Sequence, residues 1–138
     1  MVKTKDCQVR VLYADTDAMG IVYNGTYIAW LEKGRTEWLR QAGYSYKKIE
    51  EMGLLLPVSH IDIEYRHPAH YDDLLTIKTW IEKVKGATII IGYDIVNEDG
   101  IVNVHAVSEH PITDRNLKPI RIRRDLPELY AILKEEEK

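Results

Sequence analysis

The fold of this chain is decided by the segment YADTDAMGIVYNGTYIAWLEKGRTEWLRQA, residues 13–42. Residues 24–42 have the spacing of an amphipathic helix, and Asn24 or Thr26 can accept from the free N–H groups at its start. The apolar face of this helix carries Tyr27, Ile28, Leu31, Gly34, Trp38, Leu39 and Ala42. Gly34 in the middle of that face costs about 1 kcal/mol relative to Ala, so we expect another backbone to approach it closely. The helix is therefore expected to lie against a sheet.

Alternating apolar residues on both sides of this helix predict β-strands. One strand is expected before the helix and four after it, at residues 8–13, 58–67, 75–84, 87–95 and 102–108. Turns are expected at residues 85–86 and 98–100, and a short edge strand at residues 120–122. A final helix is expected over residues 125–136, with Asp125 as its cap. A long helix followed by consecutive antiparallel strands predicts an α+β domain in which the helix packs on the sheet.

The composition describes one globular domain that spans residues 1–138. The net charge of −3 argues against nucleic acid as a partner, because binding to a duplex needs a basic face. Cys7 is the single cysteine, which excludes a disulfide scaffold and a Cys-rich zinc site. We expect Cys7 to be a small core or edge residue. No stretch approaches the roughly 18 apolar residues of a membrane span, and the first residues do not resemble a signal peptide, so a cytoplasmic location is expected.

Asp15 and Asp17 lie in the loop between the first strand and the long helix. The start of a helix presents unpaired N–H groups and the positive end of the helix dipole. Such donors can polarise a thioester carbonyl and stabilise the oxyanion, while a nearby carboxylate activates water or attacks the carbonyl carbon. Turn and capping chemistry is the alternative interpretation of the same residues. An aspartate with its usual pKa of about 3.9 also needs burial or tight positioning to act as a base.

This segment resembles the signature of the hot-dog-fold acyl-CoA thioesterases, in the branch that contains 4-hydroxybenzoyl-CoA thioesterase and the YbgC-like enzymes. The matching residues are Asp15, Asp17, Gly20, Ile21, Val22, Tyr23, Tyr27, Glu32 and Arg35. A second segment, YRHPAHYDDL at residues 65–74, resembles the family's link between its second and third strands. Together with the order of the elements, the resemblance covers nearly the whole chain.

The resemblance implies a hot-dog α+β fold, in which a long central helix is wrapped by a five- or six-stranded antiparallel sheet. It also implies a homo-oligomer, either a dimer joined at the sheet edges or a tetramer built from two such dimers. Asp17 corresponds to the family's catalytic aspartate, which acts as general base or nucleophile. The backbone N–H groups of about Tyr23 and Asn24 correspond to the donors to the carbonyl. Many relatives carry a histidine where this chain has Asn24, which leaves the Asp17 carboxylate as the main candidate.

The remaining site predictions concern the two ends of an acyl-CoA substrate. Substrate contacts are expected from Asp15, Met19, Val58 and His60. His60 begins a strand that, in the family, approaches a neighbouring subunit's active site, and a solvated strand histidine is the alternative. The phosphates of CoA need cations, which relatives supply from comparable places. The candidates here are Lys83, Lys85, Arg121 and Arg123, with a solvated basic rim as the alternative.

Other patterns are interpreted as structural, and other functions are weighed against hydrolysis. Glu32 and Arg35 lie three residues apart on the helix and can pair, so a structural ion pair or an interface contact is expected rather than catalysis. His67 and His70 lack a convincingly spaced third ligand, so neither a metal nor a cofactor is expected. A hydroxyacyl-thioester dehydratase is disfavoured because residues 1–59 contain no histidine. A non-catalytic acyl-CoA-binding protein is the other alternative to an enzyme that hydrolyses acyl-CoA thioesters.

Overall fold

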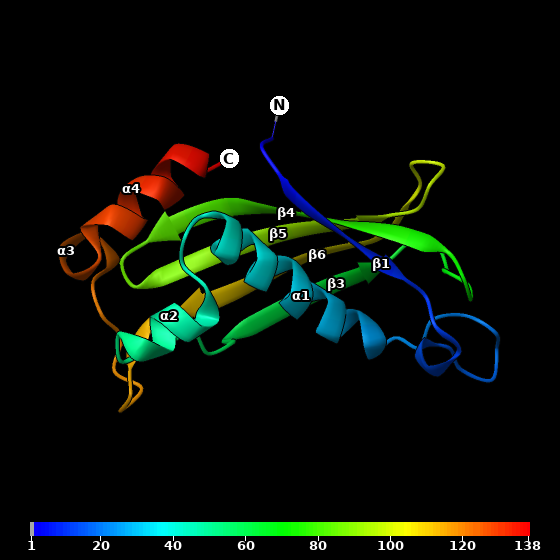
Figure 1. Ribbon diagram of the computed structural model, residues 1–138, viewed down its shortest axis with the longest axis horizontal. Helices are drawn as coiled ribbons and strands as arrows, with labels where there is room; N and C mark the ends of the chain where they lie inside the picture. Colours follow the sequence, from blue (N-terminus) through cyan, green and yellow to red (C-terminus); the bar gives the residue numbers. More distant parts are fainter. Residues whose placement is uncertain (1) are drawn as a thin grey trace.

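The structure, a computed structural model, describes residues 2–138 and places one long helix across an antiparallel sheet (Figure 1). The sheet has five strands in the order β1-β4-β5-β6-β3. Their bounds are Lys5–Arg10 (β1), His60–Tyr65 (β3), Leu74–Lys85 (β4), Thr88–Val96 (β5) and Val102–Pro111 (β6). The long helix, α1, covers Thr26–Gln41. This arrangement confirms the α+β class and the helix-on-sheet packing that the sequence predicts.

Smaller elements lie at the two ends of the sheet and the long helix. They are the 3₁₀ turn η1 (Tyr13–Asp15), α2 (Tyr46–Glu51), β2 (Leu54–Leu55), β7 (Thr113–Asp114), α3 (Ile122–Asp125) and α4 (Pro127–Glu136). β2 and β7 pair with each other as a separate two-stranded sheet. α4 packs beside β4 and buries Leu129 and Leu133. Among residues 2–138, no helix combines the length and apolar character that crossing a membrane requires.

The core lies between α1 and the inner face of the sheet, and Gly34 sets how closely they approach. A Cβ atom at Gly34 would lie 2.6 Å from Oγ1 of Thr79 and 2.7 Å from Cγ2 of Ile77. Both of these neighbours are side chains of β4, whereas the sequence predicted contact with a backbone. The glycine thus lets α1 rest directly on the strand, as a residue with no side chain allows.

The start of α1 differs from the prediction. The helix begins at Thr26, its N-cap is Gly25, and no side chain accepts from its first N–H groups. The predicted caps are therefore wrong: the hydroxyl of Thr26 instead donates to the carbonyl of Asp15 at 3.3 Å. Because no side chain of the loop accepts from these first N–H groups, donors there stay available to a ligand.

The short elements show further differences from the sequence prediction. The predicted edge strand at residues 120–122 is wrong, since Ile122 begins α3 and the small strand is β7. Asp125 does not cap the final helix: its carboxylate accepts from the N–H of Arg121 at 2.9 Å, and α4 begins at Pro127. α2 was not predicted, although Ser45 caps it by accepting from the N–H of Lys48 at 3.1 Å.

Candidate active site

The loop between β1 and α1 is a tight turn that projects Asp17. The N–H of Asp17 donates to the carbonyl of Ile21 at 2.9 Å, and the N–H of Gly20 donates to the carbonyl of Asp17 at 3.0 Å. Gly20 has a φ of +79°, a left-handed conformation that favours glycine. Thr16 and Val22 form a bridge that closes the turn. The sequence Asp-x-x-Gly therefore makes a small closed loop that holds the carboxylate at its base.

This loop is anchored to the second segment that the sequence analysis singled out. The N–H of Val22 donates to the carbonyl of Ala69 at 2.9 Å, and Ile21 forms a bridge with His70. The rings of Tyr13 and Tyr71 stack with their centroids 3.8 Å apart. The two matched segments, distant in sequence, thus form one end of the molecule.

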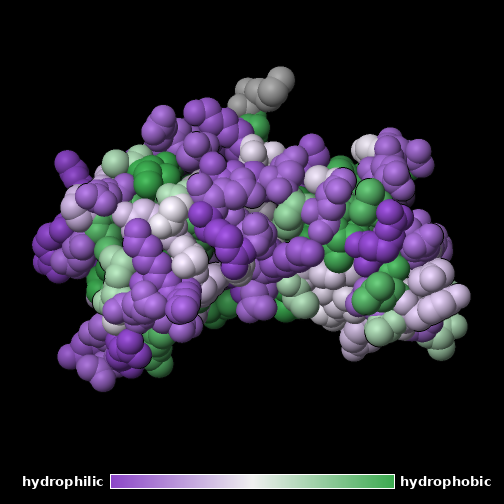
Figure 2. Space-filling view, viewed as in Figure 1, coloured by the Kyte–Doolittle hydropathy of each residue, from purple (hydrophilic) through white to green (hydrophobic). Residues whose placement is uncertain are grey.

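An open cavity of about 490 Å³ lies where these segments meet the start of α1. It is lined by Asp17, Met19, Ile21, Val22, Tyr23, Asn24, Tyr27, Tyr65, Arg66, His67 and Pro68. The surface at this end of the molecule is pale and green, which marks apolar and weakly polar residues (Figure 2). Met19 is 76 % exposed on this surface. Four residues predicted for the site, Asp17, Met19, Tyr23 and Asn24, therefore share one cavity.

The Asp17 carboxylate is half-buried and fixed by its own loop. Its Oδ1 accepts from the N–H of Met19 at 2.8 Å. Its other oxygen, Oδ2, has no donor within residues 2–138. A carboxylate held by one bond at one oxygen keeps the second oxygen available for a water molecule or for the substrate carbon.

The structure agrees with only part of the prediction for the N–H donors at the start of α1. The N–H of Tyr23 donates to the carbonyl of Asp15 at 2.8 Å, so this group is already used inside the loop. The N–H groups of Asn24 and Gly25 have no acceptor within the part of the chain from residue 2 to residue 138. The hydroxyl of Tyr65 donates to the carbonyl of Asn24 at 3.1 Å and fixes this peptide. The free donor that lines the cavity is therefore the N–H of Asn24, and the free N–H of Gly25 is its neighbour in the chain.

Asp15 belongs to the framework of the loop rather than to the cavity. Its Oδ2 accepts from the N–H of Leu12 at 2.8 Å and so closes η1, and it does not line the cavity. Its carboxylate and its carbonyl both hold the backbone, and the predicted substrate contact of Asp15 stays a prediction. Val58 and His60 also lie away from this cavity, at the opposite end of β3 from Tyr65.

The predicted CoA-phosphate residues form a separate basic cluster. Lys83 and Lys85 lie near the turn between β4 and β5, and α3 is joined to that turn by a bond from the N–H of Ile122 to the carbonyl of Gly86 at 3.2 Å. Three arginines, Arg121, Arg123 and Arg124, line an open cavity of about 540 Å³ there. This end of the molecule is opposite the Asp17 loop (Figure 1). Within one chain these basic residues therefore lie near one another but far from Asp17.

Other predictions on polar residues have mixed outcomes. Glu32 is exposed and Arg35 is buried, and no ion pair joins them within residues 2–138, so the ion pair is not found and the interface contact stays a prediction. Arg35 instead donates from Nε to the hydroxyl of Tyr46 at 3.4 Å. Across the described chain, no group of three His, Cys, Asp or Glu side chains is placed to hold a metal ion. Cys7 is half-buried against the core, and burial raises the pKa of its thiol.

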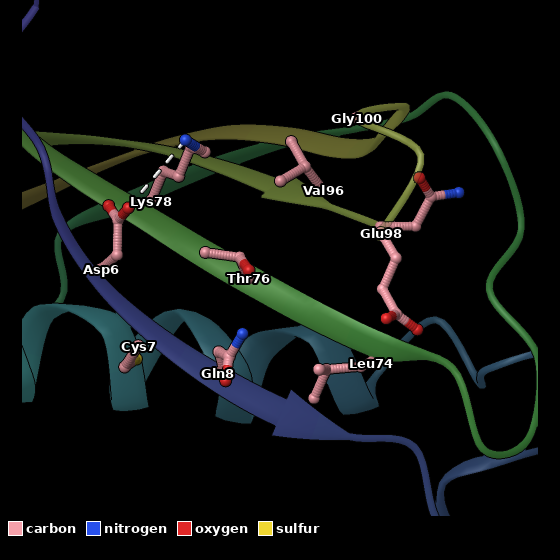
Figure 3. A pocket seen from close by; sticks show the side chains of 10 residues that line it. Asp6, Cys7, Gln8, Leu74, Thr76, Lys78, Val96, Glu98 and Gly100 are labelled. Atoms are coloured by element: carbon pink, nitrogen blue, oxygen red, sulfur yellow. Dashed lines mark ion pairs between the residues drawn. The ribbon is translucent and has the colours of Figure 1, made fainter.

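A third cavity, of about 630 Å³, lies beside β1, β4 and the turn after β5 (Figure 3). Asp6 and Lys78 form an ion pair of 3.9 Å within it. Its side chains come from strands and a turn, and its lining includes no residue of a helix. The Asp17 cavity is the better candidate active site because it combines a free carboxylate oxygen with free N–H donors.

The structure adds residues to the site that the sequence did not assign to it. Tyr65, Arg66, His67 and Pro68 line the cavity from the end of β3. Tyr27 also lines it, and burial raises the pKa of its phenol to about 12. In the sequence, these five residues could have been found from their position within, or next to, the two segments that match the family.

A long helix across an antiparallel sheet is the arrangement of the hot-dog proteins, and comparisons with known proteins agree. The family model for the thioesterase superfamily matches residues 19–104. YneP from Bacillus subtilis (strain 168) is 38 % identical over 125 residues, which are 90 % of this chain and 91 % of that protein. The acyl-CoA thioester hydrolase YbgC from Escherichia coli O6:H1 is 36 % identical over 112 residues, 80 % of this chain and 84 % of that protein.

A solved structure supports the same conclusion about the fold. The DHNA-CoA thioesterase from Staphylococcus aureus superimposes with a TM-score of 0.91 at 29 % identity and covers 98 % of this chain and 91 % of that chain. The hot-dog fold that the sequence resemblance implied is confirmed by this likeness. The chain belongs to the thioesterase superfamily.

Proposed function

We propose that this protein hydrolyses acyl-CoA thioesters to a free acid and CoA. One observation carries the proposal: a carboxylate with a free oxygen, that of Asp17, lines the same cavity as Asn24, whose N–H has no acceptor within residues 2–138. Thioester hydrolysis needs both an activator of water and donors to the developing oxyanion. The relatives named as acyl-CoA thioester hydrolases support the choice of substrate.

In the proposed reaction the carbonyl oxygen accepts from the N–H groups at the start of α1. Asp17 then takes a proton from water as the water oxygen attacks the carbonyl carbon, or it attacks that carbon itself to form an anhydride that water opens. The C–S bond breaks, and the thiolate of CoA takes up a proton as it leaves. The positive end of the α1 dipole favours the negative charge on the oxygen.

The proposed function includes a homodimer formed through β3. β3 is an edge strand of the sheet, and Ile61 and Ile63 on it are only half-buried. An unpaired edge of this kind is a template for pairing with another strand. A two-fold axis would pair β3 with its own copy, since a closed homodimer uses the same surface twice.

Such a dimer would bring the predicted site residues that lie far from Asp17 in one chain close to the Asp17 cavity of the partner. Antiparallel pairing of all six β3 residues sets His60 opposite the partner's Tyr65, at the partner's cavity. Val58 then lies beside that cavity as well. Lys83, Lys85, Arg121 and Arg123 lie at the His60 end of the chain, from which they can reach the phosphates of a CoA bound by the partner. We therefore propose that each substrate is held by both subunits.

A panel of acyl-CoA substrates tests the proposed function through release of free thiol. We expect hydrolysis of at least one acyl-CoA, and no hydration of crotonyl-CoA, which a dehydratase would catalyse. Tight binding of acyl-CoA without turnover across the panel would show a binding protein instead. Label in the Asp17 carboxylate after a single turnover in isotope-labelled water would show the anhydride route, because direct attack by water places the label in the acid alone.

A further inference from the structure

Tyr65, at the end of β3, has a hydroxyl group that the proposed reaction does not use. The residue lines the Asp17 cavity and is 52 % exposed. Its hydroxyl donates to the carbonyl of Asn24 at 3.1 Å. Within residues 2–138 no backbone N–H donates to this carbonyl. Tyr65 therefore supplies a hydrogen bond that the Asn24 carbonyl would otherwise have to take from water.

The two free N–H groups at the start of α1 belong to two consecutive peptide groups. The N–H of Asn24 shares a peptide plane with the carbonyl of Tyr23, which accepts from the N–H of Thr26 at 3.0 Å. The N–H of Gly25 shares a plane with the carbonyl of Asn24, which accepts from Tyr65. Because a peptide group is planar, a bond at its oxygen also restricts the direction of its N–H. The first donor is thus held by the helix backbone and the second by a side chain of β3.

The ring of Tyr65 is placed by its contact with α1. It meets the ring of Tyr27 edge to face, with centroids 5.7 Å apart and an interplanar angle of 64°. Tyr27 is buried and packs edge to face on Trp30 in turn, with centroids 5.2 Å apart. Aromatic pairs favour this geometry. The ring and the hydroxyl of Tyr65 therefore both contact the start of α1, which orients the phenol toward the Asn24 carbonyl.

A hydrogen bond to the carbonyl oxygen of an amide also changes the N–H of that amide. Hydrogen bonds in a chain polarise one another, so a donor at the oxygen makes the N–H a stronger donor. Donors that are already oriented contribute strongly to catalysis, because they need not move as charge develops on the substrate oxygen. The hydroxyl of Tyr65 can thus increase the stabilisation of an oxyanion without contacting the substrate.

We infer that Tyr65 is a positioning residue for the N–H donors at the start of α1. The inference rests on the proposed function and goes beyond it, because it assigns a role in the reaction to a side chain of the edge strand. Tyr65 acts through the peptide group between Asn24 and Gly25. Loss of its hydroxyl should therefore slow the chemical step more than it weakens the binding of substrate.

Tyr65→Phe removes the hydroxyl and keeps the ring that packs on Tyr27. Loss of an oxyanion donor lowers kcat by about a hundredfold or more, so loss of its positioning should lower kcat by about tenfold. We expect KM for the best acyl-CoA substrate to stay within about twofold of the wild-type value. Sedimentation verifies that the variant keeps the oligomeric state of the wild type.

Tyr71→Phe is the matched control. Tyr71 is a tyrosine at the same end of the molecule, it is 46 % exposed, and it does not line the Asp17 cavity. Its variant also loses one phenolic hydroxyl, so we expect the wild-type kcat and KM.

The carbonyl stretch of a bound thioester distinguishes positioning from a general loss of structure. Asp17→Asn protein should bind acyl-CoA with an isotope-labelled carbonyl without cleaving it quickly, and difference infrared spectra then report the stretch. Donors to the carbonyl oxygen weaken the C=O bond and lower this frequency. We expect a smaller downshift, relative to free acyl-CoA, when Tyr65→Phe is added to Asp17→Asn, and no change when Tyr71→Phe is added.

Failure of the inference and failure of the proposed function give different results. A wild-type protein that cleaves no acyl-CoA defeats the proposed function before any variant is made. An active wild type retains that function. The role of Tyr65 is then overturned if Tyr65→Phe leaves either kcat or the carbonyl frequency unchanged, or if Tyr71→Phe changes both to the same extent.

Discussion

Two carboxylates two residues apart have different roles in this loop. Asp15 holds the N–H of Leu12 with its side chain and the N–H of Tyr23 with its carbonyl, so it builds the turn. Asp17 lines the cavity and keeps one oxygen free. The loop thus separates the residue that maintains its shape from the residue proposed to act on substrate.

Replacing Asp15 tests this division of roles. Asp15→Ala leaves the N–H of Leu12 without its acceptor, and we expect the free energy of unfolding to fall by about 1 kcal/mol, as for the loss of a helix cap. Denaturant titration measures this change. A variant of unchanged stability with a raised KM for acyl-CoA would contradict the structural role and restore the substrate contact that the sequence predicted.

His110 predicts how stability depends on pH. It is buried in β6, and its Nε2 lies 2.7 Å from the hydroxyl of Ser108. Burial, together with the charge of Arg35, lowers the pKa of His110 from 6.5 to about 4. Between these two values the unfolded chain binds a proton that the folded chain does not, so stability falls as the pH drops from 6.5 toward 4. Urea midpoints across this range measure the slope.

The matched variant for this pH dependence is His110→Gln, which keeps a polar group for Ser108 but does not titrate. We expect the stability of the variant to depend less on pH between 6.5 and 4 than that of the wild type. Equal slopes in the two proteins would show that His110 does not contribute, and that carboxylates account for the whole loss.

Prediction at the level of single residues was strongest where the residue type itself carries the chemistry. The residue pattern pointed to Asp15 and Asp17 together, and the resemblance singled out Asp17 and Asn24, which the structure places at one cavity. The sequence could not show that the N–H of Tyr23 is used by the carbonyl of Asp15. Backbone donors look alike in every sequence, and their partners depend on the path of the loop.

At the scale of elements, the contact of α1 with β4 depends on Gly34. Gly34→Ala places a Cβ atom 2.6 Å from Oγ1 of Thr79, which is closer than packing allows. Ala is the better helix former by about 1 kcal/mol, but overpacking costs about 1–3 kcal/mol, so we expect a net loss of stability. The urea midpoint should fall, and a rise would show that α1 can shift away from the sheet freely.

Glu32→Ala is the matched change on the exposed face of the same helix. Glu32 forms no ion pair with Arg35 in the described chain, so its removal should alter stability by no more than about 0.5 kcal/mol. A loss of about 3 kcal/mol or more would show that Glu32 does pair with the buried guanidinium.

The long elements could be predicted from periodicity, whereas the short ones could not. α1 and the strands from β3 to β6 bury alternate or helically spaced apolar residues, which a pattern detects. α2 has six residues, of which Ile49 alone is buried, so it offers no measurable period. α3 and η1 are shorter still, and backbone bonds to neighbouring segments fix their positions.

At the scale of the whole molecule, the proposed dimer predicts a specific cross-link. Symmetric pairing of β3 sets residue 60 of one subunit opposite residue 65 of the other, within the reach of a disulfide. In a Cys7→Ser background, His60→Cys combined with Tyr65→Cys should therefore form a covalent dimer on mild oxidation. Denaturing gel electrophoresis without reductant measures it.

The single variants His60→Cys and Tyr65→Cys are the controls, because neither cysteine faces its own copy in this pairing. A covalent dimer from either single variant, or none from the double variant, would contradict the pairing of β3. Sedimentation of the unmodified protein would then show whether another surface forms the oligomer.

The layered arrangement of the molecule could be predicted from the order of its elements, but the assembly of the site could not. Val58 and His60 were grouped with Asp17 by resemblance, yet within one chain they lie at the opposite end of β3. Spacing along a strand gives direction and face but not the position of a second subunit. The same holds for Lys83 near the end of β4 and Arg121 before α3, because this end of β4 and α3 lie opposite the loop before α1 (Figure 1).

The rate of thioester hydrolysis by Asp17→Asn tests the central claim most directly. Asn keeps the size of the side chain and an acceptor for the N–H of Met19, so the loop should retain its shape, which circular dichroism verifies. With the best substrate of the acyl-CoA panel, we predict that kcat falls by about a hundredfold or more, since general-base catalysis contributes that much. A folded Asp17→Asn protein that hydrolyses this substrate at the wild-type rate would contradict the account.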